Sequence, residues 1–167
     1  QFKGANNALE ISKSFSVDVE KADEAKATNA LDGIAFVIGA KFKNSPSLAA
    51  YIELKKAQGL NVYTIDIPAK TSADQTRSKI KALYAAKKDL KYAVIVGDAE
   101  DIPGKQSKII NGLTDHYFSA IDTNSYEKDM NGPDIAVGRI AVSDETQLAS
   151  VLRKYTRYIK GDFTSRS

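Results

Sequence analysis

Residues 92–103, Tyr-Ala-Val-Ile-Val-Gly-Asp-Ala-Glu-Asp-Ile-Pro, decide the fold, because an unbroken apolar run ends here in an acidic loop. Residues 94–96 are consecutive β-branched residues, which is typical of a strand covered on both faces, as in parallel sheets. Gly97 ends the strand and Asp98 begins the loop. Ligands of open α/β sheets bind at the carboxyl ends of the strands, so Asp98 is a candidate for a binding site. Asp98 also fits a simple Asx turn at a strand end.

Two further apolar stretches, residues 33–40 and 60–67, precede this strand, and helix signals follow each of them. In residues 45–59, a serine followed by a proline supplies an N-cap and a proline at the first helical position. The Ser-x-x-Gln pattern of residues 72–75 has the spacing of a capping box. The resulting order of strands and helices predicts an α/β fold, a three-layer sandwich with a mostly parallel, twisted sheet and helices on both faces.

An antiparallel addition is predicted after residue 105. Residues 105–112 are polar and contain glycine, and residues 114–121 are expected to form a strand beyond them. A turn-rich loop at residues 122–133 leads to a short strand at residues 134–139. Ser143 is expected to cap a final helix with a continuous apolar stripe.

The length of the chain fits one globular domain, since 167 residues with 43% hydrophobic content can bury a sizeable core. Residues 1–32 are interpreted as a lead-in segment, in which alternating apolar residues are typical of an edge strand. Residues 33–160 form the α/β unit, and residues 161–167 are interpreted as a linker.

Composition excludes several classes of site. The 24 basic and 21 acidic residues are mixed along the chain, so no polycationic tract indicates nucleic acid binding. Cysteine is absent, which excludes disulfides, thiolate metal sites and a cysteine nucleophile within this chain. A single histidine cannot build a histidine-based metal cluster. No apolar run approaches the roughly 20 residues that span a bilayer.

His116 lies between Asp115 and Tyr117, which suggests a catalytic Asp-His pair. Neighbours on a strand point to opposite faces, however, and no serine or cysteine stands in a recognisable nucleophile setting, so a structural role is favoured. A nucleotide site is also disfavoured, because no Gly-x-Gly-x-x-Gly or P-loop pattern follows any predicted strand.

Four acidic residues form a candidate metal site: Asp98 at the strand end, and Asp122, Asp129 and Asp134 around the turn-rich loop. If the two strands that border this loop flank the third strand, these carboxylates converge. Oxygen ligands from a loop suit Ca²⁺ better than zinc or copper. Aspartate is also a usual turn residue, so spacing alone leaves both interpretations open.

Four motifs in this order resemble the gingipain family of secreted bacterial cysteine endopeptidases. They are Val-Gly-Asp-Ala-Glu-Asp-Ile-Pro at residues 96–103, Thr-Asp-His-Tyr at 114–117, Pro-Asp-Ile-Ala-Val-Gly-Arg at 133–139, and Tyr-Thr-Arg-Tyr at 155–158. The resemblance implies two α/β subdomains, with a His-Cys dyad in the second, caspase-like one. This chain resembles the first, non-catalytic subdomain, so no catalytic residue is expected in it, and its lack of cysteine agrees with the resemblance.

The resemblance also implies structural calcium. Asp98 matches the family's first ligand, Asp134 the last, and Asp122 a backbone-carbonyl position. Asp129 is the candidate for the middle of a loop that is longer here than in the family pattern. Arg139 is expected to make a structural ion pair, because arginine favours bidentate carboxylate partners.

The function implied by the resemblance is the N-terminal portion of a secreted or cell-surface cysteine endopeptidase that hydrolyses peptide bonds. This chain would be an inactive scaffold whose partners are the second catalytic subdomain and protein or peptide substrates, and residues 161–167 would lead toward that subdomain. A second hypothesis is a non-catalytic protein-binding or adhesion module of the same fold. A third is a receiver-like or nucleotide-binding doubly wound domain, for which a functional lysine or phosphate loop is not found.

Overall fold

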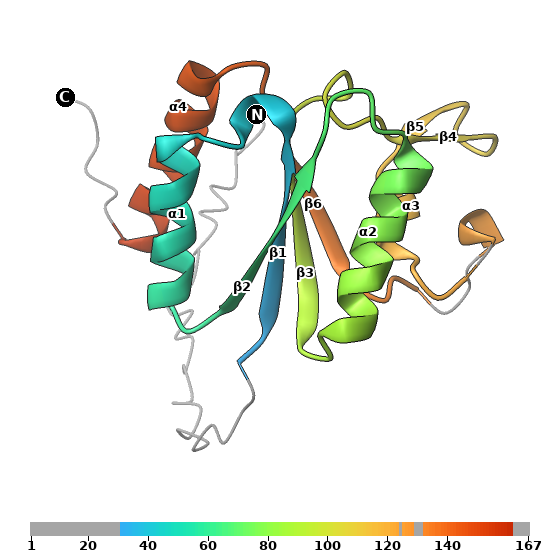
Figure 1. Ribbon diagram of the computed structural model, residues 1–167, viewed down its shortest axis with the longest axis horizontal. Helices are drawn as coiled ribbons and strands as arrows, with labels where there is room; N and C mark the ends of the chain where they lie inside the picture. Colours follow the sequence, from blue (N-terminus) through green and yellow to red (C-terminus); the bar gives the residue numbers. More distant parts are fainter. Residues whose placement is uncertain (1–30, 124, 129–131, 162–167) are drawn as a thin grey trace, which may run out of the picture.

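The computed structural model describes residues 31–123, 125–128 and 132–161, and a four-stranded parallel sheet runs through the centre of this part (Figure 1). The strands are β1 (Gly33–Gly39), β2 (Asn61–Ile67), β3 (Leu90–Val96) and β6 (Ala136–Ile140), in the order β2-β1-β3-β6. Each neighbouring pair is parallel, which confirms the predicted sheet. The edge strand predicted within residues 1–32 and the linker predicted beyond Gly161 lie outside the described residues.

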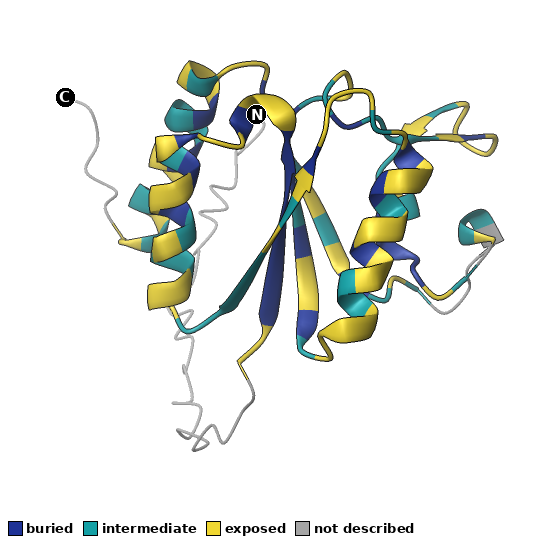
Figure 2. Ribbon diagram, in the orientation of Figure 1, coloured by how far each residue is buried: buried dark blue, intermediate teal, exposed yellow. Residues whose placement is uncertain are grey.

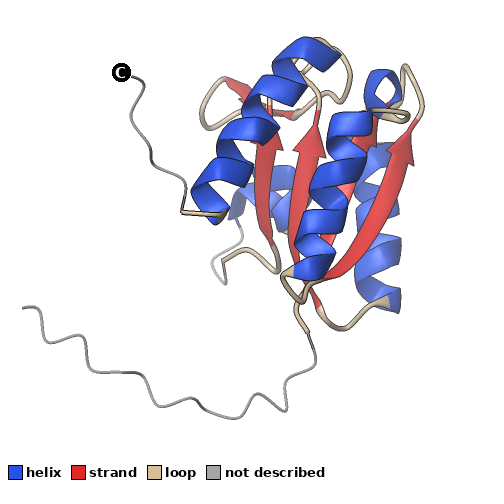
Figure 3. Ribbon diagram, turned by 90° about the vertical axis from the view of Figure 1, so that its left-hand side faces the viewer, coloured by secondary structure: helices blue, strands red, loops and turns tan. Residues whose placement is uncertain are grey.

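Helices cover both faces of the sheet, as predicted (Figure 3). Helices α1 (Pro46–Ala57) and α4 (Glu145–Ile159) pack on one face, while α2 (Ala73–Ala86) and the short α3 (His116–Ser119) pack on the other. Two short 3-10 helices, η1 (Ala40–Phe42) and η2 (Tyr126–Lys128), lie in the connections.

The predicted helix starts are confirmed atom by atom. The Ser45 hydroxyl accepts the Leu48 N–H at 3.0 Å. Ser72 and Gln75 form the reciprocal capping box, with distances of 3.2 and 2.9 Å. These bonds satisfy backbone donors that the first helical turn leaves free, so helices α1 and α2 begin at defined positions.

The core has two layers, one on each side of the sheet. All seven residues of β1 are buried (Figure 2). Alternate strand residues enter opposite layers: Ala35 and Ile95 pack toward α2 and α3, whereas Phe36 and Val96 pack toward α1 and α4. Burial of each large apolar side chain contributes roughly 1.5–3 kcal/mol, so the central strands β1 and β3 anchor the domain.

The antiparallel addition is present but shorter than predicted. Strands β4 (Lys105–Ser107) and β5 (Gly112–Thr114) form a separate antiparallel pair. The prediction of a strand over residues 114–121 is wrong, because the chain turns into α3 after β5. Residues 118–121 are all buried, which differs from the alternating burial of a strand with one exposed face.

The predicted cap of the last helix is also wrong by one residue. Asp144 is the N-cap of α4, and its Oδ1 accepts the Gln147 N–H at 2.8 Å. The Ser143 hydroxyl is therefore available for another partner, which lies at the end of β3.

Candidate functional site

The loop that follows β3 is a tight turn organised by Asp98. Its Oδ1 accepts the backbone N–H groups of Glu100 (3.0 Å) and Asp101 (3.2 Å), which is the Asx turn that the sequence allows. Gly97 has a φ of +126°, and a Cβ placed on it would lie 3.1 Å from the Asp101 Cβ. The turn therefore requires glycine before the aspartate.

The second carboxylate oxygen of Asp98 is also engaged. The Ser143 hydroxyl donates to Asp98 Oδ2 at 2.9 Å, which joins the start of α4 to the end of β3. This bond lowers the pKa of Asp98, with further contributions from the N–H groups of Asp101 and Glu100 and from the charge of Lys41, while partial burial acts in the opposite direction. These contacts favour the ionised form of Asp98 and give its carboxylate a structural role.

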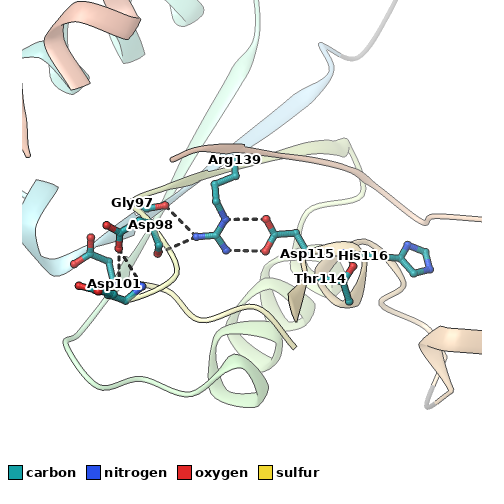
Figure 4. Close-up of polar contacts among 8 residues, drawn as sticks. Gly97, Asp98, Asp101, Thr114, Asp115, His116 and Arg139 are labelled. Atoms are coloured by element: carbon teal, nitrogen blue, oxygen red, sulfur yellow. Dashed lines mark hydrogen bonds and ion pairs between the residues drawn. The ribbon is translucent and has the colours of Figure 1, made fainter. Parts of the chain in front are cut away.

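Arg139 of β6 forms the largest polar contact of the site (Figure 4). Its Nε and Nη2 donate to the two oxygens of Asp115 at 2.7 and 2.6 Å, in a bidentate ion pair. Its Nη1 donates to the carbonyls of Gly97 and Asp98, both at 3.0 Å. We refer to this set, Arg139, Asp115, Gly97 and Asp98, as the arginine clamp, and it confirms the predicted structural ion pair.

The arginine clamp explains the conformation of Asp115. This residue stands at the N-cap of α3, but its side chain does not cap the helix and instead binds Arg139. The Arg139 side chain is 14% exposed and that of Asp115 31%, so the pair is shielded from water on most sides. The N–H donors of this guanidinium are occupied by Asp115 and by two carbonyls, so it cannot bind a substrate carboxylate through a bidentate pair. The clamp joins three segments of the chain: β6, the start of α3 and the loop after β3.

Sequence reasoning missed a second buried carboxylate at this end of the sheet. Asp101 pairs with Lys41 at 3.0 Å, and its side chain is only 8% exposed. It lies beside Gly39 and Gly97, where an added Cβ would approach it to 3.2 and 3.1 Å. The position of Asp101 within the motif at residues 96–103 could have indicated a role for it. Residue spacing alone does not show, however, that the loop turns back over the strand ends and buries this side chain.

The structure does not bring the four predicted calcium ligands together. Asp98 follows the carboxyl end of β3, whereas Asp134 precedes the amino end of β6. Five paired residues, from the Tyr92–Ala136 pair to the Val96–Ile140 pair, separate these two ends, a length of about 16 Å along the strands. One ion therefore cannot contact both carboxylates.

Asp134 has local partners of its own. Its Oδ2 accepts the N–H groups of Ile121 and Asp122, at 2.5 and 2.9 Å, so it closes the loop that leads into β6. Asp122 is exposed beside it, and Asp129 lies outside the described residues. Within the described ranges no three His, Cys, Asp or Glu side chains are grouped as a metal site. Calcium stays a prediction for the loop that Asp122, Asp129 and Asp134 border.

His116 has contacts that favour the structural role predicted for it. Its Nδ1 lies 3.0 Å from the Ser119 Oγ and its Nε2 lies 3.2 Å from the Tyr126 carbonyl. As expected, Asp115 does not pair with the imidazole, since it binds Arg139. The expectation assumed a strand at these residues, whereas the structure has the start of α3. Ser119 is 5% exposed and also donates to the His116 carbonyl at 2.8 Å. Ser119 thus holds His116 within α3, and the imidazole contact with Tyr126 links α3 to η2.

The fold and the site define the class of protein: a parallel α/β sandwich in which the polar residues at the strand ends hold segments of the chain together. The family model described as Peptidase family C25 matches residues 29–166, and the chain belongs to this family, that of the gingipains. Lys-gingipain from Porphyromonas gingivalis is 26% identical over 138 residues, which cover 78% of this chain and 8% of that protein.

Solved structures share the fold. A structure titled "Structure of Protease" superposes with a TM-score of 0.68 at 23% identity and covers 83% of this chain and 30% of the other. The Arg-specific cysteine proteinase gingipain R gives a TM-score of 0.65 at 19% identity, with 76% of this chain and 28% of the other covered. The present chain thus spans less than a third of the length of the proteins that it matches. The described residues include no helix long and apolar enough to cross a membrane.

Proposed function

We propose that this chain is the first, non-catalytic subdomain of a C25 cysteine endopeptidase and supports a second subdomain that carries the catalytic histidine and cysteine. One observation carries the proposal: the guanidinium and both carboxylates of the arginine clamp are bound within the fold, in a chain that contains no cysteine but belongs to a peptidase family. The polar end of the sheet is thus built to hold segments together and not to react.

The chemistry proposed for the intact protein is cleavage of a peptide bond. A cysteine thiolate attacks the scissile carbonyl, a histidine protonates the leaving amine, and backbone N–H groups hold the oxyanion. This chain supplies none of these groups. Its contribution is to fix the position of the subdomain that does, and its partners are that subdomain and the protein or peptide substrates.

We extend the proposal to a secreted or cell-surface location, which the resemblance to gingipains supports.

The proposal is tested by comparing the complete reading frame with the 167-residue chain. We expect the complete protein to hydrolyse peptide substrates and to lose this activity after alkylation of its cysteine, while the chain alone is inactive. A reading frame without a catalytic histidine and cysteine, or a complete protein without peptidase activity, would contradict the proposal and would favour the binding module of the same fold.

Calcium is tested separately in the complete protein. If the loop bordered by Asp122, Asp129 and Asp134 binds calcium, a chelator lowers the melting midpoint and added Ca²⁺ restores it, because a ligand that binds the folded state stabilises it. Asp134→Asn should abolish this response and Asp98→Asn should keep it, since Asp98 lies at the other end of the sheet. An unchanged midpoint after chelation would exclude the ion.

A further inference from the structure

Strands β2 and β6 are the two edge strands of the sheet, and the unpaired edge of β6 differs from that of β2. The Ile140 carbonyl accepts the Gly97 N–H at 3.0 Å, so the backbone groups of Ile140 face β3. Because the backbone of a strand alternates with a period of two, Gly138 and Ala136 also face β3, whereas Val137 and Arg139 direct their N–H and C=O groups away from it. In the part of the chain that the structure describes, no strand pairs with that side.

The opposite edge of the sheet provides a direct comparison. The Asn61 N–H donates to the Asp32 carbonyl at 3.1 Å, so Val62, Thr64 and Asp66 are the outward residues of β2. Thr64 and Asp66 are exposed, and Asp66 forms an ion pair with Lys43 at 2.9 Å. Charged and polar side chains of this kind prevent unwanted strand pairing. The edge of β2 is therefore protected.

The edge of β6 carries no such protection within residues 136–140. Of its two outward residues, Val137 is apolar and half-buried, and the neighbouring Ala136 and Gly138 are exposed without a polar side chain. The one charged residue of the strand, Arg139, turns inward to Asp115. No atom lies within 4 Å of a Cβ placed on Gly138, so the surface there is open.

A hollow lies on each side of this edge. A cavity of about 410 Å³ on the α3 side is lined by His116, Ser119, Pro133 and Val137 among others. A second hollow of about 250 Å³ on the α4 side is lined by Val94, Gly138, Ile140 and Tyr155 among others. Successive side chains of an added strand point to opposite faces of the sheet, so such a strand would place them alternately in the two hollows.

We propose that β6 is the docking edge for the second subdomain, which adds an extended segment to this side of the sheet by pairing with Val137 and Arg139. This inference rests on the proposed function, because it requires a second subdomain. Solved relatives are more than three times as long as the part matched here, so they contain the material for such a partner. Tyr155, in the last turns of α4, lines one hollow, so the carboxyl-terminal part of α4 lies beside this edge. The arginine clamp holds β6 in place for pairing.

Hydrogen exchange in the complete protein tests the docking edge residue by residue. The Val137 and Arg139 amides should exchange at least about 100-fold more slowly than the Thr64 and Asp66 amides, which face outward from the protected edge. The difference should disappear in the 167-residue chain alone. Equal exchange of the four amides in the complete protein would overturn the proposal.

Edge variants provide the second measurement. Val137→Pro removes an outward N–H and obstructs an approaching strand without removing a bond to β3, and Thr64→Pro makes the matched change on the other edge. We expect Val137→Pro to lower peptidase activity at least tenfold and Thr64→Pro to leave it within twofold. Gly138→Lys, which adds a charge over open space, should reproduce the loss if Val137→Pro does not fold. Full activity in Gly138→Lys would contradict the docking edge.

The two proposals fail separately. A complete protein that is an active cysteine peptidase but shows no protection at Arg139 disproves the docking edge and leaves the function standing. A protein that protects Arg139 but lacks activity disproves the function and leaves the docking edge standing.

Discussion

Two adjacent residues of β6 lie in opposite environments. Arg139 points into the domain, where four hydrogen bonds fix its guanidinium to Asp115 and to the loop after β3. Gly138 pairs with β3 through its backbone, and a Cβ placed on it would meet open space. We call the surface of β6 that carries the Arg139 side chain its inner side, and the exposed surface at Gly138 its outer side. The inner side is fully bonded within this chain, whereas the outer side is left uncovered by the described residues. A single edge strand can therefore serve the fold with one side and an assembly with the other.

The largest effect is expected from Arg139→Met. The substitution leaves the Asp115 carboxylate and two loop carbonyls without their donor, so we expect the free energy of unfolding to fall by about 3 kcal/mol. Urea unfolding of the 167-residue chain measures this loss. Arg139→Lys keeps the charge but not the bidentate geometry and should give an intermediate loss. A variant as stable as the parent would show that the inner side of β6 is not a clamp.

Gly97→Ala should have the next largest effect. An alanine at a φ of +126° is strained, and its methyl group would lie 3.1 Å from the Asp101 Cβ. We expect a loss of about 2 kcal/mol in the free energy of unfolding. Gly138→Ala is the matched glycine on the outer side. Similar losses in both variants would remove the distinction between the two environments.

Ser143→Ala tests the contact between α4 and Asp98 through its pH dependence. Because the pKa of Asp98 lies below its ordinary value, the ionised carboxylate stabilises the fold above about pH 4, and this contribution is lost as the pH falls through the folded-state pKa. We expect Ser143→Ala to be less stable by under about 1 kcal/mol at pH 7 and to approach the parent at an acidic pH below the folded-state pKa of Asp98.

Urea unfolding at both pH values measures this dependence. Ser78→Ala is the matched control, since its hydroxyl donates to the Asp74 carbonyl at 2.9 Å and not to a carboxylate. Its effect should be the same at both pH values. A loss in Ser143→Ala that does not change with pH would contradict the ionic contribution of Asp98.

The smallest effect is expected from Gly138→Ala in the 167-residue chain. A methyl group meets open space there, so the melting midpoint should correspond to a change within about 0.5 kcal/mol of the parent. A large loss would mean that the outer side of β6 is already packed.

The sheet and the larger helices could be predicted because their signals are local. The apolar runs of β1 and β3 identify buried strands, and the Ser-Pro and Ser-x-x-Gln patterns place helix starts where the structure has them. The turn into α3 could not be read in the same way, because it depends on Asp115 leaving its capping position to bind Arg139, which is 24 residues away. Short elements take their conformation from tertiary partners more than from propensity.

Of the polar contacts predicted from the sequence, the ion pair of Arg139 is confirmed, and the calcium site stays a prediction. The ion pair of Arg139 follows from the chemistry of a guanidinium, which seeks a carboxylate wherever the fold supplies one. The convergence of Asp98 with Asp134 required strand register, which sequence spacing does not contain. Parallel pairing of β6 with β3 places the residue before one strand and the residue after the other at opposite ends of the sheet.

The arginine clamp also sets an order of assembly. Strands β1, β2 and β3 and their connecting helices are encoded between residues 33 and 96, so they can fold together as this part of the chain leaves the ribosome. Arg139 bonds to Gly97 across 42 residues, so this contact closes a long loop and belongs to the non-local part of the fold. The Lys41–Asp101 ion pair can hold the loop after β3 before β6 exists. Arg139 adds its bonds to Gly97 and Asp98 once β6 has been synthesised, so the docking edge forms together with the contact that secures it.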